Sequence, residues 1–247
     1  IRVLWQDERD AVQLFAMSNI KAGTFAQVYQ SPEVGGNVWE VQHLNAENDY
    51  EQDYATYVDT QIPAGEPYRR ETISAYGITR PAEARRKALW HCKANRYLKS
   101  MVTFETGLDA IACEPGDRIE VQHDVPQWGV GGRVISGGDT SVVLDTQVTL
   151  AAGSTYQVMV RHSADDTIET RTITDGAGSY WTLTTLPAWT LNPAADDVWA
   201  IGVTNVVTKP CVVSSIKRTS DLECAIEAIE YVADAYDVEI DTVDYVN

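Results

Sequence analysis

The side chains best suited to chemistry in this 247-residue chain are four cysteines, four histidines and a surplus of carboxylates. The cysteines follow no Cys-x-x-Cys spacing and are Cys92, Cys113, Cys211 and Cys224. Widely spaced cysteines on apolar stripes predict buried free thiols. The histidines are also isolated, and a pair such as His123 with Asp124 is more typical of a solvated loop than of a ligand set. The sequence therefore predicts no metal site.

Motifs of nucleophilic, phosphate-binding and dinucleotide-binding sites are missing from the sequence, which has no Gly-x-Ser-x-Gly, no Gly-x-x-x-x-Gly-Lys-Ser/Thr and no Gly-x-Gly-x-x-Gly. A pair such as Glu105 with Glu114 has the groups that a glycosidase uses, but 36 Asp and Glu make accidental pairs common. The alternating oxygen side chains of residues 45–53 lack the turn glycine of an EF-hand, which favours an exposed acidic strand or loop. We expect no enzyme activity and no cofactor.

A basic helix is predicted over residues 80–99. Thr79 can cap it, and Pro81 suits its first turn, where a missing N–H costs nothing. Its apolar stripe consists of Ala84, Ala88, Leu89 and Cys92. Its other faces carry cations, namely Arg85, Arg86, Lys87, Lys93, Arg96 and Lys99. Such a helix packs on one side only.

Period-two alternation replaces the helical pattern after residue 100 and predicts a half-buried strand over 102–106. The turn Pro115-Gly116-Asp117 then leads into a strand over 118–122. That strand, which can extend to 123, is the first of a consecutive series. The others are predicted at 132–135, 140–144, 155–161, 168–174, 180–183 and 198–203. Short strands separated by turns form a small barrel or sandwich, with Trp181, Trp189 and Trp199 in its core or at its mouth.

Two more strands are predicted after Pro210, over 211–217 and 222–228. If they pair with the strand at 102–106, the barrel is inserted into a first domain. A hairpin turn is predicted at Asp165-Asp166, because apolar residues alternate on both sides of it.

Composition limits the class of protein. An apolar content of 44% excludes a disordered chain, and no apolar run approaches the roughly 20 residues that span a bilayer, so we expect no direct membrane insertion. The chain begins at Ile1 without a signal-peptide pattern, which is typical of a piece of a longer polypeptide.

Charge is distributed unevenly along the chain. The formal net charge is −17, and no Lys or Arg follows Arg218. The acidic end and the basic helix are either ordinary solvated faces or a complementary pair in which one copy's acidic end faces another copy's helix. An overall acidic chain is unsuited to sequence-specific nucleic-acid binding.

Several short motifs occur in a fixed order, and the chain at these residues resembles a known family. They are Arg80-Pro81-x-x-Ala84-Arg85, Asn95-Arg96, residues 102–110, Pro115-Gly116-Asp117, Trp128-Gly129 and Gly132-Arg133-Val134. The set resembles the tail tip attachment (host-specificity) proteins of lambda-like tailed phages, of the baseplate hub family. The resemblance covers most of residues 37–236, while the first 36 residues match no family that we can name.

The resemblance implies a β-rich α+β fold. It implies an α/β hub domain, residues 1–114 and 210–247, that is interrupted by a small antiparallel β-barrel at 115–209. In such hubs, barrels from three copies, with a second barrel in each copy, build a ring in which barrel edges meet. The implied protein is a homotrimer at the virion tail tip, made in the host cytoplasm. It contacts other tail proteins, joins tail tube to tip and lines the DNA exit channel.

On this interpretation the site residues are assembly residues. The predicted set is Arg85, Arg86, Lys93 and Arg96 for charged contacts, Pro115, Gly116 and Asp117 for the turn, and Gly132, Arg133 and Val134 for the next strand. Each also has a local structural explanation, which for the turn glycines is the better one. The alternative function is a carbohydrate-binding β module that recognises the host surface through Trp128, Trp181 and Trp189.

Overall fold

The computed structural model describes residues 10–30, 35–62, 65–124, 128–204, 207–220 and 222–238. These residues divide into two compact units. We call residues 29–100 with 232–238 unit 1, and residues 10–28 with 101–231 unit 2. The predicted domains, 1–114 with 210–247 and 115–209, concern independent folding and stay a prediction.

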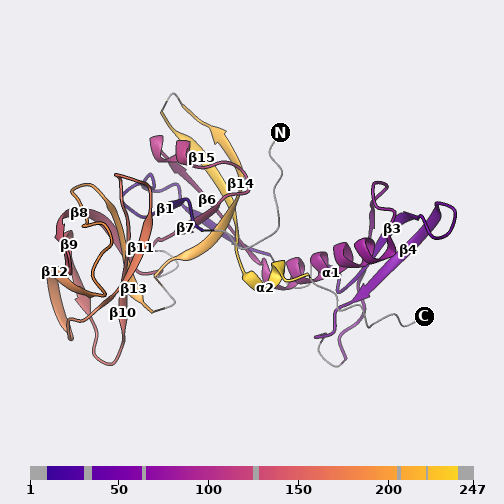
Figure 1. The fold of residues 1–247 in the computed structure, drawn as a ribbon, viewed down its shortest axis with the longest axis horizontal. Coiled ribbons are helices and arrows are strands. Elements are labelled where there is room, and N and C mark those ends of the chain that lie inside the picture. The colour runs from indigo at the N-terminus through magenta and orange to yellow at the C-terminus, as the bar shows by residue number, and fades with distance from the viewer. Residues whose placement is uncertain are drawn as a thin grey trace. The chain divides into compact units, whose positions relative to one another are not determined.

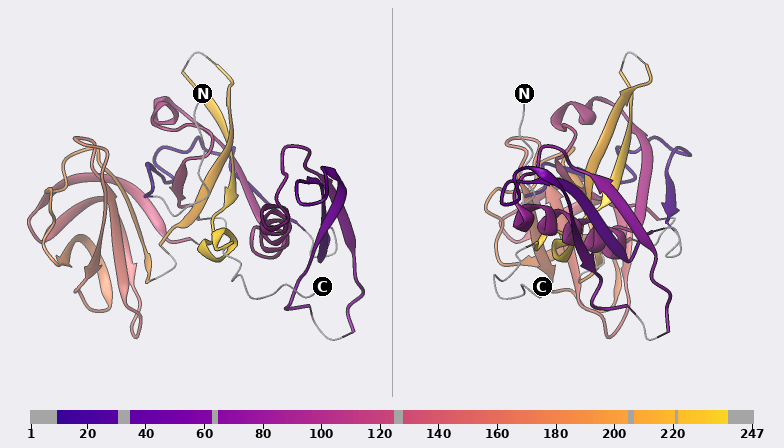
Figure 2. Two further views of the ribbon diagram at one scale, coloured as in Figure 1. Left: turned by 45° about the vertical axis from the view of Figure 1, so that its right-hand side comes forward. Right: turned by 90° about the vertical axis from the view of Figure 1, so that its right-hand side faces the viewer.

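Unit 1 is a three-stranded sheet with a helix on one face (Figure 1). Strand β3 (Val38–Asn45) lies between antiparallel β4 (Glu51–Val58) and parallel β5 (Arg70–Ser74). Helix α1 (Pro81–Tyr97) packs on β3 and β4, and Figure 2 shows it beside the same sheet from two other directions. The short helix α2 (Ala233–Tyr236) contacts α1. The core between sheet and helix contains Val41, Ala55, Ala84 and Ala88.

Helix α1 confirms the predicted apolar stripe, because Ala84, Ala88, Leu89 and Cys92 are its buried residues. The predicted cap is wrong. The helix begins at Pro81 with Arg80 as N-cap, and no side chain caps it. Thr79 is held elsewhere, since its carbonyl accepts a hydrogen bond from Ala46 N at 2.9 Å, just after β3. Backbone pairing with the hairpin therefore fixes the entry of the chain into α1.

Unit 2 contains a six-stranded sheet of order β1-β7-β14-β15-β6-β2. Its strands are β1 (Gln13–Phe15), β2 (Ala26–Tyr29), β6 (Ser100–Thr106), β7 (Arg118–Val121), β14 (Lys209–Arg218) and β15 (Cys224–Glu230). The short 3₁₀ helix η1 (Leu108–Ala112) follows β6. The predicted pairing is confirmed, because β15 pairs antiparallel with β6. The rings of Phe15 and Phe104 meet at 5.1 Å in the core of this sheet.

The rest of unit 2 is a closed six-stranded barrel, seen at the left of Figure 1. Its strands are β8 (Val130–Gly138), β9 (Ser141–Leu150), β10 (Tyr156–Arg161), β11 (Ile168–Ile173), β12 (Gly178–Leu186) and β13 (Val198–Val203). Its neighbouring strands are antiparallel, as predicted, and β13 closes it by pairing with both β10 and β8. The hairpin at Asp165-Asp166 joins β10 to β11, with Asp166 at φ 62°.

The barrel is inserted between β7 and β14, which are neighbours in the six-stranded sheet. The predicted β-rich α+β fold with an inserted barrel is therefore confirmed. One detail differs. Strand β7, expected among the barrel strands, belongs to the sheet, because its edges pair with β1 and β14 and the barrel starts only at β8. The barrel is closed within one copy, although β11 pairs with β12 only at Thr172 and Ile173, and the expected meeting of barrel edges between copies stays a prediction.

Within the described part of the chain, neither helix combines the length and apolar composition needed to cross a bilayer.

Candidate assembly surface and barrel junction

Helix α1 positions the four cations predicted for assembly, and the structure gives them different surroundings. Arg96 pairs with Asp59, and both side chains are mostly buried. Lys93 lies 3.6 Å from the carboxylate of Asp237, in the acidic segment that follows α2. These two cations are therefore used within unit 1. The pairing of Lys93 shows that α1 meets acidic residues of its own chain, whereas the predicted contact between copies remains a prediction.

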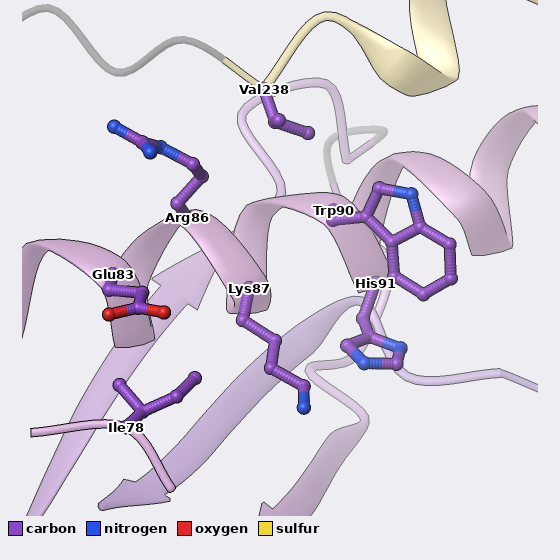
Figure 3. A pocket seen from close by; sticks show the side chains of 7 residues that line it. All are labelled: Ile78, Glu83, Arg86, Lys87, Trp90, His91 and Val238. Carbon is purple, nitrogen blue, oxygen red and sulfur yellow. The ribbon is translucent and has the colours of Figure 1, made fainter. Parts of the chain in front are cut away.

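Arg86 is exposed and lines a groove along α1, whereas Arg85 is partly buried. We call this the α1 groove. It has a volume of about 670 Å³ and is lined by Ile78, Glu83, Arg86, Lys87, Trp90, His91 and Val238. Figure 3 shows the side chains from Glu83 to His91 along one stretch of α1, with Ile78 and Val238 on opposite sides of the helix in this view. The surface combines two cations with aromatic and apolar groups.

Aromatic rings form one wall of the α1 groove. His91 stacks on Trp39 with ring centroids 4.9 Å apart, and its edge-on contact with Trp90 measures 4.7 Å. Burial, assisted by the Lys87 ammonium, lowers the pKa of His91, so this imidazole is neutral at pH 7. The indole Nε1 of Trp90 is buried and has no hydrogen-bond acceptor among the described residues. The wall thus contains a buried donor that no described residue satisfies.

The turn Pro115-Gly116-Asp117 holds β14 in place. Gly116 has φ 94°, a conformation that favours glycine, and its N–H donates to Val213 O at 2.7 Å. The buried Asp117 carboxylate accepts from Glu114 N at 2.8 Å, and Asp117 O accepts from Val213 N at 2.9 Å. The turn therefore has a structural role within the sheet, and its role in assembly remains a prediction.

Gly132, Arg133 and Val134 lie in β8, where the barrel meets the six-stranded sheet. A Cβ at Gly132 would lie 2.3 Å from Asp145 Oδ1 and 2.8 Å from the Trp199 ring. Arg133 donates to Asp196 O at 2.8 Å, and Val134 is buried in the barrel core. These residues close the barrel on itself. Their role in assembly is likewise a prediction.

Sequence reasoning missed the polar residues of this junction. Gln13 and Gln122 are fully buried: Gln13 donates to Asp109 O at 3.2 Å, and Gln122 donates to Gly129 O at 2.9 Å. Gln13 lies in β1, within the first 36 residues, for which the sequence analysis named no family, and β1 pairs parallel with β7. The only indication of the buried Gln13 in the local sequence was its position next to two apolar residues. Trp90 and His91 of the α1 groove were also missed, although they continue the helical spacing of the cations.

A buried polar cluster attaches the loop 187–197 to the barrel. His162 is fully buried, with Nδ1 3.4 Å from Asp197 and Nε2 3.5 Å from Glu169. Although burial disfavours the charged form of Glu169, hydrogen bonds from the backbone N–H groups of Thr190 and Leu191, aided by nearby cations, hold its pKa below the usual value. Asp197 also accepts hydrogen bonds from Ser163 N at 2.8 Å and Ser163 Oγ at 2.7 Å, so the cluster holds the loop to the barrel.

The cysteines confirm the prediction of buried free thiols, with one exception. Cys92, Cys113 and Cys211 are buried, whereas Cys224 is half-buried. Burial raises the pKa of each of the three buried thiols to about 12, so they are protonated at neutral pH. In the described ranges, no three His, Cys, Asp or Glu side chains are grouped as metal ligands would be.

The tryptophans of the carbohydrate alternative do not share a surface. Trp189 is 5% exposed, and Arg171 lies over its ring. Trp128 packs edge-on against Phe25 at 6.2 Å. Trp181 is 53% exposed at a bulge in β12. One exposed ring is not an aromatic platform, so the geometry does not favour sugar binding by these three residues.

The sequence was also compared with models of protein families. The model of a family described as putative phage tail proteins matches residues 7–135, more than half of the chain. The chain belongs to this phage tail protein family. The predicted resemblance to tail tip attachment proteins is confirmed by two curated relatives. The tip attachment protein J of Escherichia phage SECphi27 is 26% identical over 240 residues, which are 94% of this chain and 20% of that protein.

The second relative of this phage tail protein is the tip attachment protein J of Escherichia phage SECphi4. It is 28% identical over 168 residues, which are 66% of this chain and 14% of that protein. The phage tail chain thus spans about a fifth or less of the length of these relatives.

Solved structures give weaker similarities to this phage tail protein, each at 10% identity over 93% of the chain. A chain from the virion of a native gene transfer agent particle has a TM-score of 0.47, and the match covers 34% of that chain. A tail protein from Neisseria meningitidis MC58 has a TM-score of 0.36 and is 47% covered. At these scores neither similarity is informative about function.

Proposed function

We propose that this phage tail protein is a structural, non-catalytic part of the tail tip hub, made in the host cytoplasm. In the virion, three copies together with other tail proteins would form a ring that joins tube to tip and lines the DNA exit channel. Membership of the tail protein family and the similarity to tip attachment proteins support the tip location.

The observation that carries the proposal is the filled interior of the barrel. Val134, Leu144, Val158 and Leu183 are buried there together with Trp199, and Trp189 packs against the same core. A six-stranded barrel filled in this way contains no path for DNA. A channel would therefore have to run between copies, past the outer walls of their barrels, as in a ring.

The charges of the barrel suit such a wall. Between residues 130 and 203 the cations are Arg133, Arg161 and Arg171, and there is no lysine. Arg161 pairs with Asp166 at 2.5 Å, Arg171 pairs with Glu169, and Arg133 lies 3.9 Å from Asp109. With each arginine held by a carboxylate of the same chain, the wall offers no free cation to a phosphate. DNA would be repelled rather than retained.

The test is immunogold electron microscopy of phage particles with antibody raised against this chain, using antibody pre-absorbed with the chain as control. We expect label at the distal end of the tail, and native mass spectrometry of released tips should show three copies. Label along the tail tube, or particles without label while the soluble fraction contains the protein, would refute the tip location.

A further inference from the structure

The α1 groove has properties that the ring proposal does not use. Arg86 and Lys87 make no ion pair with any described residue, although other cations of α1 do. Lys93 binds Asp237 and Arg96 binds Asp59, so carboxylates occupy this helix surface where the chain supplies them. The groove therefore contains two cations, Arg86 and Lys87, that have no ion-pair partner among the described residues.

A second observation also indicates a ligand in the α1 groove. The indole N–H of Trp90 is buried without an acceptor in the described part of the chain, and leaving such a donor unpaired is unfavourable. A main-chain carbonyl or a carboxylate of a bound peptide would satisfy it. Ile78 and Val238 supply apolar surface in the same groove, which suits an apolar side chain between the acidic ones.

We propose that the α1 groove binds an extended acidic segment of a neighbouring tail subunit. Carboxylates of the segment bind Arg86 and Lys87, one carbonyl accepts from Trp90 Nε1, and an apolar side chain packs against Ile78. The identity of the partner as a tail subunit rests on the proposed function. The chemistry of the groove does not.

Charge decides between a peptide and a nucleic acid as the occupant. The formal net charge of −17 repels a long polyanion. A short peptide carries only a few charges, and beyond the Debye length of about 8 Å at physiological salt the rest of the protein is screened. For a short peptide, attraction by the cations of the groove therefore outweighs repulsion by the net charge of the protein.

The test measures binding of a fluorescein-labelled peptide to the full chain by fluorescence anisotropy at low salt. In this peptide, Asp and Glu alternate with Val and Tyr. The matched peptide replaces each Asp by Asn and each Glu by Gln. We expect R86E/K87E to weaken binding at least about tenfold, because two charge-assisted hydrogen bonds are lost and two like charges face the peptide. Trp90→Phe keeps the bulk of the ring but loses the N–H, and should weaken binding about threefold or more.

The control variant K217E/R218E makes the same change in net charge on β14, outside the groove. It should bind within about twofold of the unsubstituted chain, because neither residue lines the groove. Circular dichroism verifies folding, and R86Q/K87Q replaces the reversed pair if that variant unfolds. Equal weakening by the control, or equal binding of the amide peptide, would overturn the proposal.

A comparison of chains 1–247 and 1–238 identifies the occupant. Much tighter peptide binding by the shorter chain would show that the chain's own last residues fill the groove, and it would also overturn the proposal. Failure of tip labelling with peptide binding intact would instead refute the proposed function alone. The two proposals can therefore fail separately.

Discussion

Gly132 provides the sharpest test of how the barrel is built. A methyl group at this position would meet Asp145 Oδ1 at 2.3 Å and the Trp199 ring at 2.8 Å. Asp145 can rotate away, but it would then lose hydrogen bonds from Arg133 N at 2.8 Å and from Trp199 Nε1 at 3.1 Å. The Trp199 ring is fully buried and has little room to move.

The expected cost of Gly132→Ala follows from these contacts. Two lost hydrogen bonds cost about 2 kcal/mol together, and overpacking against a fixed ring costs about 1 to 3 kcal/mol more. We expect the free energy of unfolding of unit 2 to fall by about 3 to 5 kcal/mol, measured by urea denaturation with tryptophan fluorescence.

Gly176→Ala is the matched control. A Cβ there has no neighbour within 4 Å and the backbone φ is not positive, so the expected change stays within about 0.5 kcal/mol. If Gly132→Ala is as stable as this control, the packing argument is wrong.

Three further predictions concern buried and hydrogen-bonded groups. The folded pKa of Glu169 is lowered, so its stabilising contribution is complete above the unfolded pKa of about 4.5 and is lost as pH falls through the folded value; urea midpoints from pH 6 to 3 should fall less for Glu169→Gln. Cys211, with a pKa of about 12, should react with Ellman's reagent at pH 8 far more slowly than the half-buried Cys224, and equal rates would contradict its burial. Asp117→Ala should cost about 1 to 3 kcal/mol, because the Glu114 N–H loses its acceptor, and an unchanged urea midpoint would contradict this.

Local patterns in the sequence determined the type and approximate limits of most elements. Period-two alternation located β6, turn residues delimited the barrel strands, and the stripe from Ala84 to Cys92 identified the buried face of α1. The Pro115-Gly116-Asp117 turn and the hairpin at Asp165-Asp166 were also predictable. These features depend on neighbouring residues, whose steric limits and spacing act over a few positions.

Only the tertiary structure decided which strands pair. Strand β7 pairs with β1 and β14, whereas β8 pairs with β9 and β13, and the partners of both strands include residues far away in the chain. The packing role of Gly132 required Trp199 from a distant strand, and the α1 groove required Val238 beside residues 78–91. Contacts between residues far apart in the chain follow from the total burial and backbone pairing of the fold, and no short window of sequence contains that information.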